Sequence, residues 1–196
     1  MFTSPSRATT LRTAFFGLFL LFAAPVFANE VKKIEGLMRQ GQMAQALEKT
    51  DALLRSEPNN VQGRFLKAVL VMEQGQAVEA INLFTRLTEE FPELPEPYNN
   101  LAVLYARQGE YERARSALEM AIHADPGYGV AYENLGDVYA RMAALAYDKA
   151  NQLDGGNKGA LQKVQMMREA VAISTRQARK TPVPSAPLGS PAAKSK

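Results

Sequence analysis

The hydrophobic positions in the C-terminal half of the chain follow a helical period. Apolar side chains between Val130 and Asp154 recur every three or four residues: Leu135, Tyr139, Met142, Ala146, Ala150 and Leu153. This spacing predicts one continuous amphipathic helix of about 37 Å. Gly155-Gly156 ends it, and a second stripe predicts a helix from about Lys158 to Arg176: Leu161, Val164, Met167 and Val171. Alternating β-branched runs are missing, so we expect an all-α protein.

Upstream of these helices, three features recur at a spacing of 34 residues. They are a Gln-Gly pair, an alanine and a proline: Gln40-Gly41, Gln74-Gly75 and Gln108-Gly109; Ala46, Ala80 and Ala114; Pro58, Pro92 and Pro126. The glycine allows the positive φ that ends a first helix, and the alanine fits the close crossing of two antiparallel helices. The proline stops the second helix. The pattern predicts repeated helix-turn-helix units.

The third unit carries the fullest set of repeat residues: Tyr98, Leu101, Ala102, Tyr105, Gly109, Tyr111, Ala114, Leu118, Ala121 and Pro126. With the 34-residue period, this set resembles the tetratricopeptide repeat (TPR) family. The second unit departs from the pattern at Arg64 and Lys67, the first has Ile34 where a small residue is usual, and the fourth lacks the turn glycine. The resemblance implies a TPR solenoid of about three full repeats, a fused fourth and a C-terminal capping helix.

The resemblance also implies where a partner binds. In TPR proteins the first helices of successive units line a concave groove that holds a helical ridge or an extended peptide. On that pattern the groove wall consists of Phe65, Val69, Met72, Asn99, Asn100, Val103, Arg107, Glu133, Asn134, Asp137 and Arg141. We expect the first three to set selectivity.

Asparagines at the positions of Asn100 and Asn134 bond the peptide backbone in several TPR proteins, although asparagine is also simply frequent there. Val130 and Asn134 stand where a two-carboxylate clamp needs lysine and arginine. This departure argues against a C-terminal carboxylate as the ligand.

The charge is unevenly distributed along the 196 residues. The net charge is +3, but residues 29–175 hold sixteen basic and twenty acidic side chains, so the basicity comes from the two ends. A slightly acidic body without clustered lysines and arginines argues against nucleic-acid binding.

The N-terminal residues have the pattern of an export signal. Arg7 and Arg12 precede an apolar stretch from Ala14, and Val26 and Ala28 provide small side chains for cleavage after Ala28. The stretch is shorter than the ~20 residues of a membrane span, although a retained anchor is the alternative. We expect a signal peptide at residues 1–28 and a periplasmic protein without a stable membrane span after cleavage, provided that the organism has two membranes.

The residues offer little for catalysis or metal binding. There is no cysteine, which removes disulfides, thiolate ligands, cysteine nucleophiles and lipid attachment. His123 is the single histidine, and one histidine does not make a catalytic triad or a zinc site. We expect no enzyme activity, cofactor or metal.

The last part of the chain is rich in proline, alanine, serine and lysine. Residues 180–196 cannot bury enough apolar surface to order themselves, so we expect a disordered tail after a TPR solenoid at residues 29–179. The sequence thus predicts a non-catalytic periplasmic adaptor. It would bind a protein or peptide segment of an envelope protein in its concave groove, in envelope assembly, secretion or cell division. The alternative is a homo-oligomeric brace that uses the long fourth-unit helix.

Overall fold

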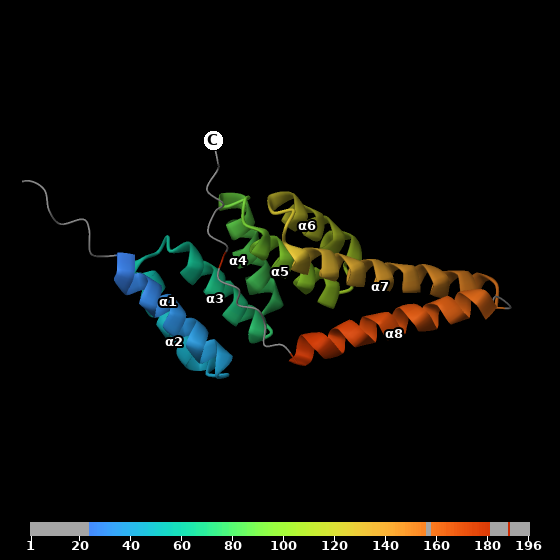
Figure 1. Ribbon diagram of the computed structural model, residues 1–196, viewed down its shortest axis with the longest axis horizontal. Coiled ribbons are helices and arrows are strands. Elements are labelled where there is room, and N and C mark those ends of the chain that lie inside the picture. Colours follow the sequence, from blue (N-terminus) through green and yellow to red (C-terminus); the bar gives the residue numbers. More distant parts are fainter. Residues whose placement is uncertain (1–23, 156–157, 181–187, 189–196) are drawn as a thin grey trace, which may run out of the picture.

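The computed structural model describes residues 24–155, 158–180 and 188. This part of the chain contains helices and no strands, which confirms the all-α class (Figure 1). The helices are α1 (Ala24–Arg39), α2 (Met43–Ser56), α3 (Val61–Glu73), α4 (Ala77–Glu90), α5 (Pro95–Arg107), α6 (Tyr111–Ala124), α7 (Gly129–Leu153) and α8 (Lys158–Lys180). The last two match the helices predicted from the hydrophobic stripes, and α8 runs four residues past Arg176.

Each of the first three helix pairs reverses direction at its glycine. Gly41, Gly75 and Gly109 have φ values of 73°, 77° and 78°, and they are the positive-φ residues of the described chain. After Gly75, the amide N–H of Gln76 donates to the carbonyl oxygen of Val71 at 3.2 Å, and the other two turns repeat this bond. A side chain with a β-carbon would be strained at this φ, so the turn depends on glycine.

The repeated alanines and prolines have the predicted roles. Ala46, Ala80 and Ala114 are fully buried, each in the second helix of its pair. The helices α2, α4 and α6 end two residues before the repeated prolines. The 34-residue pattern therefore fixes both the helix ends and the helix crossings.

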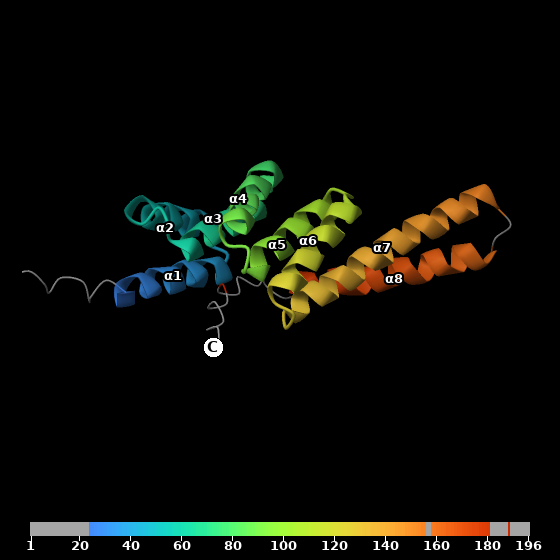
Figure 2. The same cartoon turned by 90° about the horizontal axis from the view of Figure 1, so that it is seen from above.

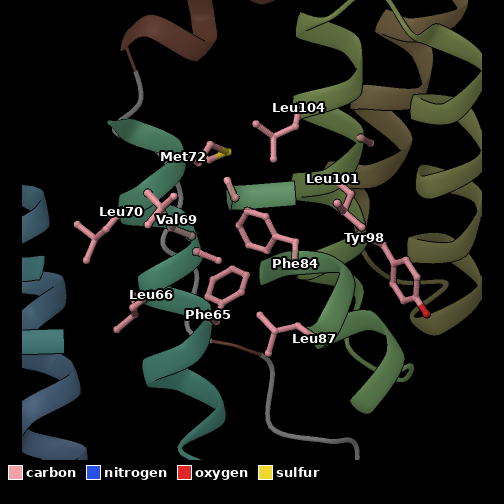
Figure 3. Close-up of a cluster of buried hydrophobic side chains, with 14 of the residues drawn as sticks. Phe65, Leu66, Val69, Leu70, Met72, Phe84, Leu87, Tyr98, Leu101 and Leu104 are labelled. Atoms are coloured by element: carbon pink, nitrogen blue, oxygen red, sulfur yellow. The ribbon is translucent and has the colours of Figure 1, made fainter. Parts of the chain in front are cut away.

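One hydrophobic core runs through the repeats. Phe65 of α3 and Phe84 of α4 meet edge to face, with ring centroids 5.8 Å apart, at the centre of the cluster in Figure 3. Leu66 and Leu70 point to the opposite side of α3, so this helix is packed on both sides. Because α3 is buried on both sides, its sequence is the most apolar of the repeat helices.

The two departures of the second unit form ion pairs between helices. Arg64 makes two hydrogen bonds of 2.6 Å to the carboxylate of Glu90 on α4, and Lys67 contacts Asp51 on α2 at 2.8 Å. Charged side chains thus replace the usual apolar contacts of α3 with the helices on either side. Because these pairs are partly exposed, their net contribution to stability is small.

The helices α7 and α8 form a long hairpin that projects beyond the repeat body (Figures 1 and 2). The predicted stripe of α7 is only partly its packed face. Leu135 and Met142 pack against the core, whereas Tyr139 and Leu153 are exposed. The packed face is instead centred near Val138, which with Ala131 is buried in α7.

The first helix crosses the predicted cleavage site. It begins at Ala24, so cleavage after Ala28 would shorten it to residues 29–39. The remainder of the predicted signal peptide, residues 1–23, lies outside the described residues. Among the helices that the structure describes, none is long and apolar enough to cross a membrane.

The register of the repeats can be tested at a helix crossing. Ala114→Leu should lower the free energy of unfolding by about 1–3 kcal/mol, because the larger side chain overpacks the contact between helices. Chemical denaturation followed by circular dichroism measures the change. Ala44→Leu, the same replacement at an exposed position of α2, should stay within about 0.5 kcal/mol of the unmodified protein. Equal effects of both replacements would contradict the register.

Candidate functional site

The equivalent face of the first helices carries the predicted binding residues. Phe65, Asn99 and Glu133 stand 34 residues apart, and so do Val69, Val103 and Asp137, which follow them by one helical turn. We call this surface of α1, α3, α5 and α7 the inner face.

Extending the same spacing finds three inner-face residues that the sequence interpretation missed. Glu35 stands 34 residues before Val69, and Gln62 and Glu96 precede Phe65 and Asn99 by three residues. Glu35 and Glu96 keep only 8% and 5% of their surface exposed. The 34-residue period indicates these positions, although their polar side chains belong to no motif of the repeat.

The side chain of Gln62 is held between two partners. Its amide nitrogen Nε2 lies 3.5 Å from Oε1 of Glu35 on α1, which fixes the orientation of the amide group. Its Oε1 accepts a hydrogen bond of 3.0 Å from the backbone N–H of Leu188. Gln62 therefore does in α3 what was predicted for the asparagines, which is to bond a peptide backbone through an amide side chain.

The asparagines themselves are used inside the fold. Nδ2 of Asn100 donates to the carbonyl oxygen of Glu96 in its own helix at 2.8 Å. Nδ2 of Asn134 donates to Oδ1 of Asn99 at 2.7 Å and so links α7 to α5. The structure thus brings Asn99 and Asn134 together and leaves Asn100 bonded within α5.

Three predicted groove residues lie in the core. Phe65, Val69 and Met72 are almost fully buried, and Phe65 packs against Phe84 of α4. They cannot offer open pockets as the sequence interpretation assumed, because α3 is enclosed by neighbouring helices (Figure 3). Selectivity in this structure must come from other positions.

The predicted groove residues of α7 have different surroundings, because α8 packs against only part of α7. Arg141 lines a cavity of about 250 Å³ between α7 and α8, together with Tyr111, Asp148 and Met167. Its side chain therefore faces the capping helix. Among the predicted groove residues, Arg107 and Glu133 are exposed, and Val103, Asn134 and Asp137 are half-buried.

A partly buried phenol adjoins the acidic residue of α5. Burial of Tyr128 and, to a smaller extent, the carboxylates of Glu96 and Asp125 together raise its pKa to about 12, because all of them disfavour the phenolate. Tyr128 therefore stays neutral at physiological pH.

The described residues contain no group of histidines, cysteines, aspartates or glutamates that could hold a metal ion. His123 is exposed near the end of α6.

Solved structures with the same fold include TPR proteins. MamA is 23% identical, with 74% of this chain and 88% of that chain covered and a TM-score of 0.50. The Sgt2 TPR domain from Aspergillus fumigatus is 17% identical, with 65% and 83% covered and a TM-score of 0.56. YrrB, described as a TPR protein with an unusual peptide-binding site, is 23% identical, with 55% of each chain covered and a TM-score of 0.50. These likenesses show the fold.

Sequence comparison identifies the family. No curated protein matches the chain. Two family models, each described as tetratricopeptide repeat, match residues 32–95 and 71–136. Their glycine turns, buried alanines and terminal prolines are the ones seen in the structure. The two matches together span residues 32–136 of the 196, and the chain belongs to the tetratricopeptide repeat family.

Proposed function

We propose that the protein is a non-catalytic periplasmic adaptor that binds an extended segment of an envelope protein on its inner face. TPR proteins are in general scaffolds for protein interaction, and the fold here is a short TPR solenoid. The observation that carries the proposal is the inner face itself, where an amide side chain, Gln62, already holds a peptide N–H at 3.0 Å.

The accessible residues suit an extended segment with mixed side chains. Val103 offers a half-buried apolar contact, and Arg107 and Glu133 offer charges of opposite sign on neighbouring helices. A side-chain amide such as that of Gln62 bonds the backbone without regard to sequence. A partner would therefore be recognised mainly by its shape and by one or two apolar or charged side chains.

An envelope location agrees with the export pattern of residues 1–28. The absence of cysteine is consistent with a protein that folds without disulfides. Envelope assembly, secretion or cell division is the proposed setting of the adaptor.

Cleavage at Ala28 is the first testable step. Protein isolated from the periplasmic fraction should begin at Asn29, which intact-mass spectrometry and N-terminal sequencing will show. Ala28→Leu should block processing, because the peptidase needs a small side chain before the cut. Ala44→Leu is the control and should be processed normally. A periplasmic protein with an intact N-terminus would contradict the prediction.

Partner binding can be tested in intact cells with a photo-reactive amino acid. Placed at Arg107 on the inner face, it should give a specific cross-linked adduct, and placed at the exposed Arg86 of α4 it should not. Adding Val103→Asp should reduce the adduct at least tenfold, because a carboxylate replaces the apolar contact.

The matched control for this replacement is Val78→Asp, since Val78 of α4 is 73% exposed. It should leave the adduct unchanged. Circular dichroism of both variants checks that the helices are intact. Equal adducts in the two variants would contradict binding at the inner face.

A specific observation favours a second candidate, the homo-oligomeric brace. In the described chain, eight of the ten large exposed hydrophobic residues lie on α7 and α8. Tyr132, Tyr139, Ala146 and Leu153 are exposed at intervals of seven residues, so they form one stripe along α7. Such a stripe is suited to pairing with a second copy of the same hairpin.

Light scattering of the processed protein tests the brace. If the stripe pairs, the molar mass should rise towards that of a dimer with concentration, and Tyr139→Lys with Leu153→Lys should restore the monomer. Val78→Lys, on the outside of α4, should have no effect. A monomer at every concentration would contradict the homo-oligomeric brace and would not affect the adaptor proposal.

A further inference from the structure

The C-terminal tail returns to the inner face at one residue. Leu188 is half-buried, and its side chain packs against the hydrophobic core. Its backbone N–H donates to Gln62 of α3, 126 residues away in the sequence. Leu188 is the one residue after Lys180 that the structure describes, and residues 181–187 and 189–196 lie outside the described residues, so the disorder of the tail stays a prediction.

We propose that this tail is an intramolecular ligand of the inner face, with Leu188 as its anchor and Gln62 as the residue that captures its backbone. The inference rests on the proposed function, because it assigns a first occupant to the same surface. It also implies a regulatory consequence, since a partner must displace the tail from the α3 end of that surface.

The chain can reach this position from α8. The capping helix runs back from the tip of the hairpin towards the repeat body and ends at Lys180, and Figures 1 and 2 both show this course. Seven residues lie between Lys180 and Leu188, and the eight Cα–Cα steps that join the two can span at most about 28 Å. The direction of α8 thus brings its C-terminal end to the side of the repeats where α3 lies.

The chemistry of the contact is that of a peptide ligand. Gln62 is oriented by Glu35, so its Oε1 is directed at the tail while its Nε2 is already used. Leu188 provides the large apolar side chain in a stretch that otherwise consists mainly of proline, alanine, serine and glycine. Prolines at 182, 184, 187 and 191 lower the entropy that the tail loses on docking.

Tethering makes even a weak contact effective. A short flexible linker gives the tail an effective concentration on the order of 1 mM at its own binding surface. For a tail with an intrinsic Kd of about 100 µM, the ratio of docked to free tail would then be about ten. The apparent affinity of a competing partner would fall about tenfold.

The test uses a fluorescent synthetic peptide of residues 181–196 and the processed full-length chain. The chain with Leu188→Asp, whose own tail cannot dock, should bind the peptide with a Kd well below 1 mM by fluorescence anisotropy. The unmodified chain should bind it at least tenfold more weakly, because its own tail competes. Circular dichroism and thermal melting confirm that Leu188→Asp leaves the fold intact.

Gln62 is tested in the Leu188→Asp background. Adding Gln62→Ala should weaken peptide binding at least fivefold, whereas Gln45→Ala, the same replacement at an exposed position of α2, should change nothing. Equal peptide binding by the unmodified and Leu188→Asp chains would overturn the proposal, and so would a Kd above about 1 mM. Dimers of the unmodified chain that Leu188→Asp dissociates would also overturn it, because the tail would then dock on a second copy.

This experiment contains no partner, so its outcome is separate from that of the adaptor. If the peptide assay fails and the adduct at Arg107 persists, the result supports the adaptor function and contradicts docking of the tail. If the peptide binds as expected but no adduct forms even in the Leu188→Asp chain, the result supports docking of the tail and contradicts the adaptor function.

Discussion

The reversal of the backbone at three glycines determines the rest of this structure. Each glycine ends a first helix at a positive φ, and the chain then returns so that a fully buried alanine meets the neighbouring helix. The rotation and spacing of each pair follow from this turn, and they place equivalent residues of α1, α3, α5 and α7 on a common face. The inner face is thus a consequence of the turn geometry, because no first helix could form that surface alone.

Where the glycine is missing, the same sequence pattern gives a different structure. The fourth unit has no turn residue, so its helix continues through 25 residues and leaves the repeat body. Apolar residues that would pack between two short helices are then carried into solvent, including Leu153 at 77% exposure. The exposed stripe of α7 and the return path of α8 therefore have one cause, which is the loss of a single turn.

The sequence predicted what depends on local chemistry and regular spacing. Helix ends, turn glycines and buried alanines follow from φ preferences and side-chain volume, and all agree with the structure. The environment of individual side chains was harder to predict. The repeat spacing places Phe65 at an inner-face position, but its side chain belongs to the hydrophobic core, where its ring meets that of Phe84 edge to face. The contact between Gln62 and Leu188 joins residues 126 apart, and no periodicity in the chain indicates it.

The tail and the glycine turns act on binding in opposite ways. Rigid repeats hold the inner face in one shape, so a partner loses little free energy in organising it. A tethered tail uses the same preformed surface and therefore subtracts from the affinity of every partner by a similar factor, whatever that partner's sequence. Because Gln62 bonds backbone atoms, which all peptides share, competition there cannot discriminate among ligands. Discrimination must come from the part of the face that Leu188 does not occupy, around Val103 and Arg107, where side chains of the partner make the contacts.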